Sequence, residues 1–179
     1  MGLVQAIETY NYEDYKLWKG DWELINGLPL AMSPSPMREH QRIGAEFVTF
    51  LANEVRDCQE CEVVYELDYL VDSENVLRPD IALICNEEGD YITKAPKIVI
   101  EVVSASTAKR DEKVKFKIYE KEKVLYYILV YPNTLNAKIY KIEDNKYQKQ
   151  GDFTKEKYFF DDLECKVEID FKEVFKKFK

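Results

Sequence analysis

Two dense apolar runs constrain the fold of this chain most. Residues 81–85 read Ile-Ala-Leu-Ile-Cys, and residues 98–103 read Ile-Val-Ile-Glu-Val-Val. Continuous apolar runs of this length, without polar alternation, are typical of strands that are covered on both faces. The sequence therefore predicts two central strands of a sheet, with a layer of structure on each side.

The patterns around these runs predict the covering layers. Apolar residues three and four apart favour helices over 38–56 and 109–121. Asn26-Gly27, inside the short apolar segment 22–32, is a strong signal for a two-residue hairpin, which Ser33-Pro34-Ser35-Pro36 would end. Further strands are expected over 62–71, 125–130, 137–142 and 158–160, and short helices over 11–18 and 171–178. We predict an α/β fold: a mixed central β-sheet flanked by helices, with an N-terminal β-hairpin.

Length and composition favour one domain. The chain has 179 residues, 46% of them hydrophobic and 34% charged, and no repeat or Gly/Ser-rich linker divides it. We expect residues 1–179 to form a single domain. Because there is no apolar run of membrane-spanning length and no basic region with an apolar core at the start, we expect a soluble, cytoplasmic protein without membrane contact.

The charge balance limits the mode of any nucleic-acid binding. The net charge is −8 and the pI is near 4.9, whereas non-specific binding to phosphates favours basic surfaces. Residues 109–123 are the exception, with seven basic residues against four acidic ones. This segment is predicted to be a locally basic helix on an acidic protein.

The four cysteines include a Cys58-x-x-Cys61 pair, a spacing found in zinc and redox sites. No second pair follows at zinc-finger spacing, and His40 is the single histidine. We therefore expect reduced, structural thiols. A zinc protein using Cys58 and Cys61 remains the alternative, and it would need ligands from elsewhere in the chain.

Two acidic residues conflict with their apolar surroundings. Glu101 interrupts the second apolar run, and Asp80 stands at the entry to the first, after Pro79. A buried carboxylate without a partner is costly, and a cation beside it removes that cost. Two carboxylates on neighbouring strands could share one hard divalent metal ion. The ordinary alternatives are a turn residue paired with Arg78 for Asp80, and an ion pair or an edge-strand position for Glu101.

A lysine on the following helix completes this group. Steps of about 100° per residue from Asp111 place Val114, Lys115, Ile118 and Tyr119 on one helix face, and Lys113 and Lys117 on another. Lys115 is therefore predicted to point inward. The commoner explanation for a lysine among apolar residues is that its ammonium group extends to water.

These residues together resemble a known family. Pro79-Asp80, Glu101-Val102-Val103-Ser104 and the helix carrying Asp111, Lys115 and Tyr119 resemble the Uma-type restriction endonucleases of the PD-(D/E)XK nuclease superfamily. The segments Tyr12–Tyr15, Glu23–Gly27, Met32–Pro36 with His40, and Leu125–Pro132 also look like that family. The resemblance spans roughly residues 10–142 and implies a restriction endonuclease-like fold.

The resemblance also implies roles for single residues. Asp80 and Glu101 would ligate Mg²⁺, or Mn²⁺ in its place, with the backbone carbonyl of Val102 joining them. In the superfamily pattern a lysine stands two residues after the second acid, where this chain has Val103, and Lys115 is the position that matches the lysine supplied by the helix. Glu23 matches a position near the site and is assigned as a third metal-binding carboxylate.

His40 also matches a position near the site. The ordinary alternatives are an exposed hairpin residue for Glu23 and a hydrogen-bonded residue at a helix start for His40.

The function implied by the resemblance is hydrolysis of phosphodiester bonds by a metal-dependent endonuclease. Its expected partner is a nucleic acid, DNA in the first place, and related nucleases often cut both strands as homodimers. The alternative from another class is a catalytically inactive protein that keeps the nuclease fold as a binding or structural module.

Overall fold

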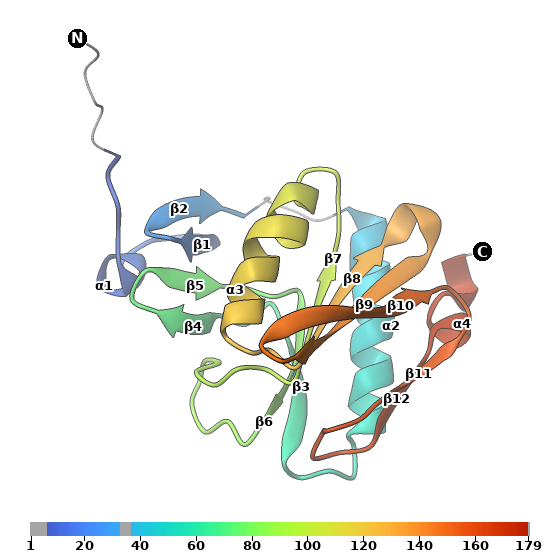
Figure 1. The fold of residues 1–179 in the computed structure, drawn as a ribbon. Coiled ribbons are helices and arrows are strands. Elements are labelled where there is room, and N and C mark those ends of the chain that lie inside the picture. The colour runs from blue at the N-terminus through green and yellow to red at the C-terminus, as the bar shows by residue number, and fades with distance from the viewer. Residues whose placement is uncertain (1–6, 33–36, 179) are drawn as a thin grey trace.

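A six-stranded mixed sheet forms the centre of the protein (Figure 1). The structure is a computed structural model that describes residues 7–32 and 37–178. In spatial order the strands are β10 (Lys146–Phe153), β9 (Asn136–Glu143), β8 (Tyr126–Tyr131), β7 (Ile98–Val102), β6 (Ile81–Cys85) and β3 (Cys61–Tyr65). All residues of β6 and β7 are buried, which confirms the two predicted central strands.

The helix that follows β7 is required by the strand order. β7 and β8 pair in parallel, so the chain must cross from one end of the sheet to the other between them. The crossing contains η1 (Arg110–Lys115), a short π-helical stretch, and α3 (Phe116–Lys121). The predicted helix over 109–121 is thus confirmed, and its first turns are wider than an α-helix.

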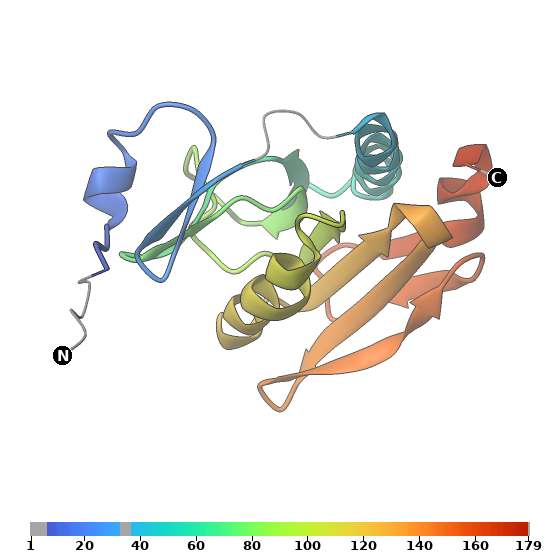
Figure 2. The ribbon, with the colours of Figure 1, turned by 90° about the horizontal axis from the view of Figure 1, so that it is seen from above.

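Helices cover the two faces of the sheet separately (Figure 2). α2 (Arg38–Glu54) buries Ile43, Phe47 and Leu51 against one face, as its three-and-four spacing predicts. Tyr119 of α3 packs against the opposite face. The same face as α2 is covered by β11 (Lys157–Phe160), β12 (Val167–Asp170), α4 (Phe171–Val174) and η3 (Lys176–Phe178).

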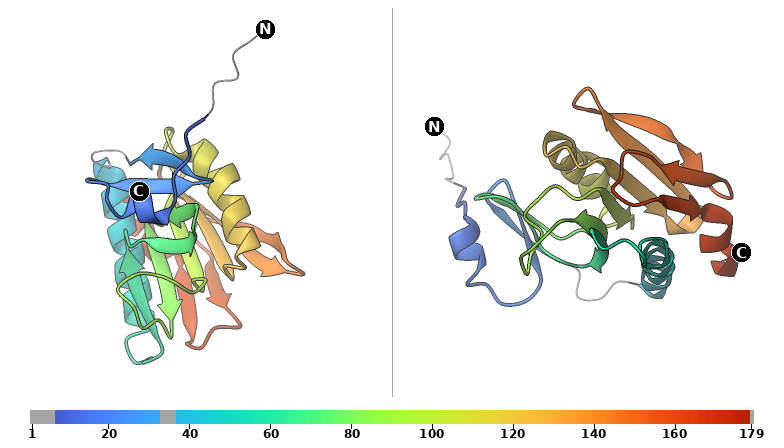
Figure 3. Two further views of the ribbon diagram at one scale, coloured as in Figure 1. Left: turned by 90° about the vertical axis from the view of Figure 1, so that its left-hand side faces the viewer. Right: turned by 90° about the horizontal axis from the view of Figure 1, so that it is seen from below.

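The N-terminal part of the chain forms a second, four-stranded sheet, which faces the viewer in the left panel of Figure 3. Its order is β2 (Leu28–Ala31), β1 (Trp22–Ile25), β5 (Asn75–Leu77) and β4 (Tyr69–Asp72), and α1 (Tyr12–Tyr15) precedes it. Asn26 and Gly27 adopt positive φ angles of 51° and 72°, so the predicted hairpin turn is confirmed. The expected end of the hairpin at residues 33–36 lies outside the described residues.

Several expected elements differ from the structure. The strand expected over 62–71 is two strands, because the backbone turns at Glu66, with a φ angle of 49°, and β3 and β4 join different sheets. An alternating pattern reports that residues face a core on one side, but not which sheet they join. The strands β5, β10 and β12 were not predicted, and the expected C-terminal helix is divided into α4 and η3.

The cysteines form two disulfides, Cys58–Cys165 and Cys61–Cys85. The expectation of four reduced thiols is therefore wrong for this structure. The pairing partners were hidden in the sequence because Cys165 lies 107 residues from Cys58. Separately, none of the helices in the described part of the chain is long and apolar enough to cross a membrane.

Candidate active site

The register of β6 and β7 places Asp80 and Glu101 opposite each other. Ile81 and Ile100 are paired across these antiparallel strands, and Asp80 and Glu101 are the next residues along the ladder. The Asp80 amide donates a hydrogen bond to Oε2 of Glu101 at 3.4 Å. The predicted pair of acids on neighbouring strands is therefore present, and Glu101 is only 2% exposed.

Lys115 lies between two carboxylates. Its Nζ atom is 2.7 Å from Oε1 of Glu23 and 2.9 Å from Oε1 of Glu101. The residue is 3% exposed, so its ammonium does not extend to water. Lys113 and Lys117 are exposed, as the face argument predicted. The inward orientation predicted for Lys115 is confirmed.

Glu23 reaches the site from β1 of the N-terminal sheet. It is fully buried, so the alternative of an exposed hairpin residue is wrong. Its Oε1 atom accepts a hydrogen bond from the backbone amide of Arg78 at 2.9 Å. Its Oε2 atom lies 3.4 Å from Nη1 of Arg110 and accepts no hydrogen bond from the residues that the structure describes. This buried carboxylate oxygen of Glu23 therefore has an ion-pair neighbour but no hydrogen bond.

His40 approaches the site from the first turn of α2. Its Nε2 atom is 3.3 Å from Oδ2 of Asp80, and that oxygen also accepts a hydrogen bond from the Val102 amide at 2.7 Å. The two groups fix the orientation of the Asp80 carboxylate. His40 thus lies at a helix start, as its ordinary alternative states, and its partner there is the proposed site residue Asp80.

The structure adds neighbours that the sequence did not assign to the site. Tyr119 donates its hydroxyl to Oε1 of Glu101 at 3.0 Å, and Asp111 is 3% exposed. Both lie four residues from Lys115 on the same helix face, so the helical spacing contained this signal. Arg78 binds Asp68 and Asp21, each at 2.7 Å, which excludes the simple pairing of Asp80 with Arg78.

Burial and crowding of acids set the protonation of the site. Burial raises the pKa of Glu101 well above its usual value despite Lys115, and the nearby acids Asp80, Asp111 and Glu23 add to the rise. Burial lowers the pKa of Lys115, but the charges of Glu101 and the three other acids raise it by more. The ammonium group therefore stays charged. Burial also raises the pKa of Asp111. The site has more carboxylates than cations to balance them.

The pKa values of Asp80 and His40 are shifted in opposite directions. Burial favours the neutral form of Asp80, but the hydrogen bond and charge of His40, followed by Lys115 and the Val102 amide, hold its pKa below the usual value. The pKa of His40 is raised because its interaction with Asp80 outweighs its own burial. The charged forms of the two side chains therefore stabilise each other.

The donor set suits a hard metal ion. Carboxylate and carbonyl oxygens are the ligands that Mg²⁺ prefers, and the number of acids gathered here and Oε2 of Glu23, which accepts no hydrogen bond, fit a cation. Among the described residues, the groups of three ligand atoms within 4.8 Å of one another all contain cysteines and lie elsewhere. No three of the described acids therefore bring their oxygens within this distance of one another, and Lys115 contacts two of them, Glu23 and Glu101.

Comparison with known proteins agrees with this architecture. A crystal structure described as "a putative nuclease belonging to DUF820 from Anabaena variabilis ATCC 29413" superposes with a TM-score of 0.77 at 15% sequence identity, covering 94% of this chain and 99% of that one. None of the curated proteins compared with the chain matches it.

The mixed sheet flanked by helices defines the class of the fold, the nuclease-like α/β fold of that structure. The chain belongs to the Uma2 family, described as "putative restriction endonuclease", whose model matches residues 12–167. The family resemblance inferred from the sequence and the predicted fold class are confirmed.

Proposed function

We propose that this protein is an Mg²⁺-dependent endonuclease that hydrolyses phosphodiester bonds in DNA. The observation that carries the proposal is the buried cluster in which Lys115 contacts Glu101 while Asp80 lies opposite Glu101 on the neighbouring strand. A charged lysine beside two acids on central strands is difficult to explain by stability alone, because burying charges has a large desolvation cost. Membership of the Uma2 family supports the same conclusion.

Asp80 and Glu101 would hold the metal ion, with the backbone carbonyl of Val102 as a further ligand. Oε2 of Glu23 would be a third carboxylate oxygen, because Oε1 is already bound by Lys115 and by the Arg78 amide. When bound, the metal ion would polarise the scissile phosphate and lower the pKa of a bound water. Mn²⁺, which also accepts oxygen ligands, is expected to replace Mg²⁺.

The remaining roles belong to side chains of the chain itself. Lys115 would orient the attacking water and offset the negative charge that develops on phosphorus, since its raised pKa keeps it charged. Glu23 would position Lys115 through their 2.7 Å contact. His40 would keep Asp80 ionised and correctly oriented.

The helix that carries Lys115 has a second, exposed face that suits contact with a nucleic-acid backbone. Lys113, Lys117 and Lys121 are exposed along the helix whose inward face carries Lys115. These lysines form a local basic strip on a protein of net charge −8, so we propose that they contact the phosphates of the substrate. We also propose that the protein acts in the cytoplasm as a homodimer, because two paired active sites can cut both strands of a duplex in one encounter.

The second candidate is a catalytically inactive protein that retains the nuclease fold. The contacts of Lys115 with both Glu23 and Glu101 favour it, because a metal ion bound by Glu101 must compete with this ammonium for the carboxylate. Such a protein would bind no Mg²⁺ at Asp80 and Glu101. The two candidates therefore differ in a measurable property.

Cleavage of supercoiled plasmid tests the proposal. We expect nicked and linear products with Mg²⁺ or Mn²⁺, none with excess chelator, and no restoration by Ca²⁺, which prefers more ligands and looser geometry. Linear product that appears together with nicked product indicates paired active sites. An RNA of matched length, incubated in parallel, tests the preference for DNA. If purified protein at micromolar concentration leaves plasmid intact with either metal, the inactive candidate is favoured.

A further inference from the structure

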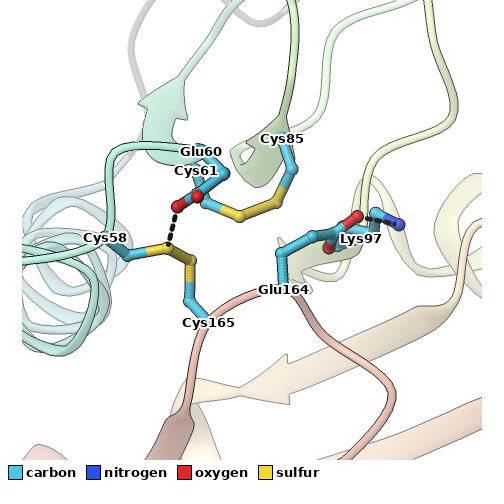
Figure 4. The surroundings of a disulfide bond; sticks show 7 residues. All are labelled: Cys58, Glu60, Cys61, Cys85, Lys97, Glu164 and Cys165. Atoms are coloured by element: carbon cyan, nitrogen blue, oxygen red, sulfur yellow. Dashed lines mark hydrogen bonds and ion pairs between the residues drawn. A yellow bond between two sulfur atoms is a disulfide. The ribbon is translucent and has the colours of Figure 1, made fainter.

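The four cysteines of the chain converge on one place, although they come from distant segments. Figure 4 shows the two disulfides side by side. The sulfur atoms of Cys58, Cys61 and Cys165 lie within 4.8 Å of one another, so Cys61 is close to both members of the other disulfide. Cys85 is bonded to Cys61 and completes the group. Three cysteine sulfurs are therefore gathered around one point, and the fourth, that of Cys85, is joined to this group through its bond to Cys61.

We propose that these four cysteines form a structural zinc site in the reduced protein, a site separate from the acid cluster. Zn²⁺ in structural sites is bound tetrahedrally by four thiolates at about 2.3 Å, which places the sulfurs about 3.8 Å apart. Cys58, Cys61 and Cys165 already lie close to this spacing, and once the disulfides are reduced the side chain of Cys85 has to turn toward the same point. A multi-iron cluster would hold its cysteine sulfurs farther apart than a single ion does, so the geometry favours one zinc ion.

The surroundings of the cysteines fit a closed site. Cys61, Cys85 and Cys165 are at most 9% exposed, and all three belong to the core under α2. Cys61 and Cys85 face each other as register partners on β3 and β6. Cys58 follows the end of α2, and Cys165 precedes β12. A zinc ion here would tie the central sheet to both elements that cover this face.

The acidic neighbours define the boundary of the ligand set. Oε2 of Glu60 lies 3.3 Å from the sulfur of Cys58, and a carboxylate oxygen of Glu164 lies within 4.8 Å of the sulfurs of Cys61 and Cys85. Glu164 forms an ion pair with Lys97 at 2.8 Å, which occupies its carboxylate. We therefore assign the four cysteine sulfurs as the zinc ligands. Glu164 is not a ligand, because it is paired with Lys97.

Reduction of both disulfides, followed by binding of Zn²⁺, converts the disulfide form of the protein into the zinc-bound form. Each disulfide reacts with two molecules of a thiol reductant, giving two cysteine thiols and one molecule of the oxidised reductant. Zn²⁺ then binds the four sulfurs, and their four protons pass to solvent. In a reducing compartment the disulfides do not persist, so the zinc-bound form is the one expected in the cytoplasm.

The zinc site lies far from the acid cluster. Asp80 and Cys85 flank opposite ends of β6, so about 17 Å of strand separates them. Failure of one proposal therefore leaves the other untouched. Zinc content reports on the cysteines, whereas plasmid cleavage reports on Asp80 and Glu101.

Metal content and thiol protection in the reduced full-length protein test the proposal. The protein is reduced with a water-soluble phosphine under anaerobic conditions, given Zn²⁺, freed of excess metal and measured by elemental analysis. We expect about one zinc per chain, and protection of all four thiols from alkylation as counted by mass spectrometry. Zinc should raise the melting temperature of the reduced protein by on the order of 5–10 °C.

Two variants sharpen this test. Cys165→Ser should lose the bound zinc, and Glu164→Gln, its neighbour, should retain it. Absence of zinc from the reduced wild type, protection of only two thiols, bound iron in place of zinc, or loss of zinc in Glu164→Gln would each overturn the four-cysteine assignment. The wild-type measurements decide the question even if Cys165→Ser does not fold.

Discussion

Replacing Asp80 by Asn, or Glu101 by Gln, should lower metal-dependent DNA cleavage by at least about 10²–10³-fold. Each change removes one negative charge from the proposed metal site and keeps the shape of the side chain. The two residues lie opposite each other on β6 and β7, so neither can substitute for the other. The rate of plasmid nicking at saturating Mg²⁺, measured for each variant, checks this prediction.

The matched control for Asp80→Asn is Asp90→Asn, because Asp90 is an exposed aspartate outside the cluster. Its cleavage rate should equal that of the wild type within error. Circular dichroism of each variant separates loss of activity from loss of fold. Cleavage by Asp80→Asn at the wild-type rate would remove Asp80 from the active site.

Replacing Lys115 by Met should destabilise the protein by about 3–5 kcal/mol. The change removes the ammonium that contacts both Glu23 and Glu101 and leaves these carboxylates without their main cation in the core. Glu23 is fully buried and Glu101 is 2% exposed, so water cannot replace the lost contact. Urea unfolding at neutral pH measures the free-energy difference. Lys117→Met, at an exposed position on the same helix, should change stability by less than about 0.5 kcal/mol.

The loss of stability in Lys115→Met should depend on pH, because Glu101 titrates. Burial already raises the pKa of Glu101 above its usual value of 4.5, and loss of Lys115 raises it further. An acid with a raised pKa in the folded state favours folding most at low pH, and this contribution is lost as the pH rises through the folded-state pKa. The difference between Lys115→Met and wild type should therefore be smallest below pH 4.5 and grow towards neutral pH. A difference that is independent of pH would show that lost packing, not charge, causes the destabilisation.

Local pattern was sufficient to predict the centre of the fold. The dense runs 81–85 and 98–103 identified the buried strands, and the misplaced acid in the second run pointed to the site. Helical spacing alone placed Lys115 on the inward face. These predictions succeed because burial of a strand on both faces, or of a helix on one face, determines the pattern of apolar residues along the chain.

Contacts between residues far apart in the chain could not be predicted from local patterns. Glu23 alternates with apolar neighbours in a short hairpin, and the sequence does not show that β1 packs its carboxylate against a helix 92 residues later. The pairing of Cys58 with Cys165 is equally remote. The break at Glu66 depends on which sheet each half joins, which is a tertiary property.

Binding of Mg²⁺ and Mn²⁺, measured by isothermal titration calorimetry, tests the central claim most directly. Wild-type protein, with its disulfides intact so that the cysteines bind no metal, is titrated beside Asp80→Asn and Glu101→Gln. We predict that wild type binds both ions and that either variant loses this binding. Equal binding by wild type and both variants, or no binding by wild type, would contradict a metal site at Asp80 and Glu101.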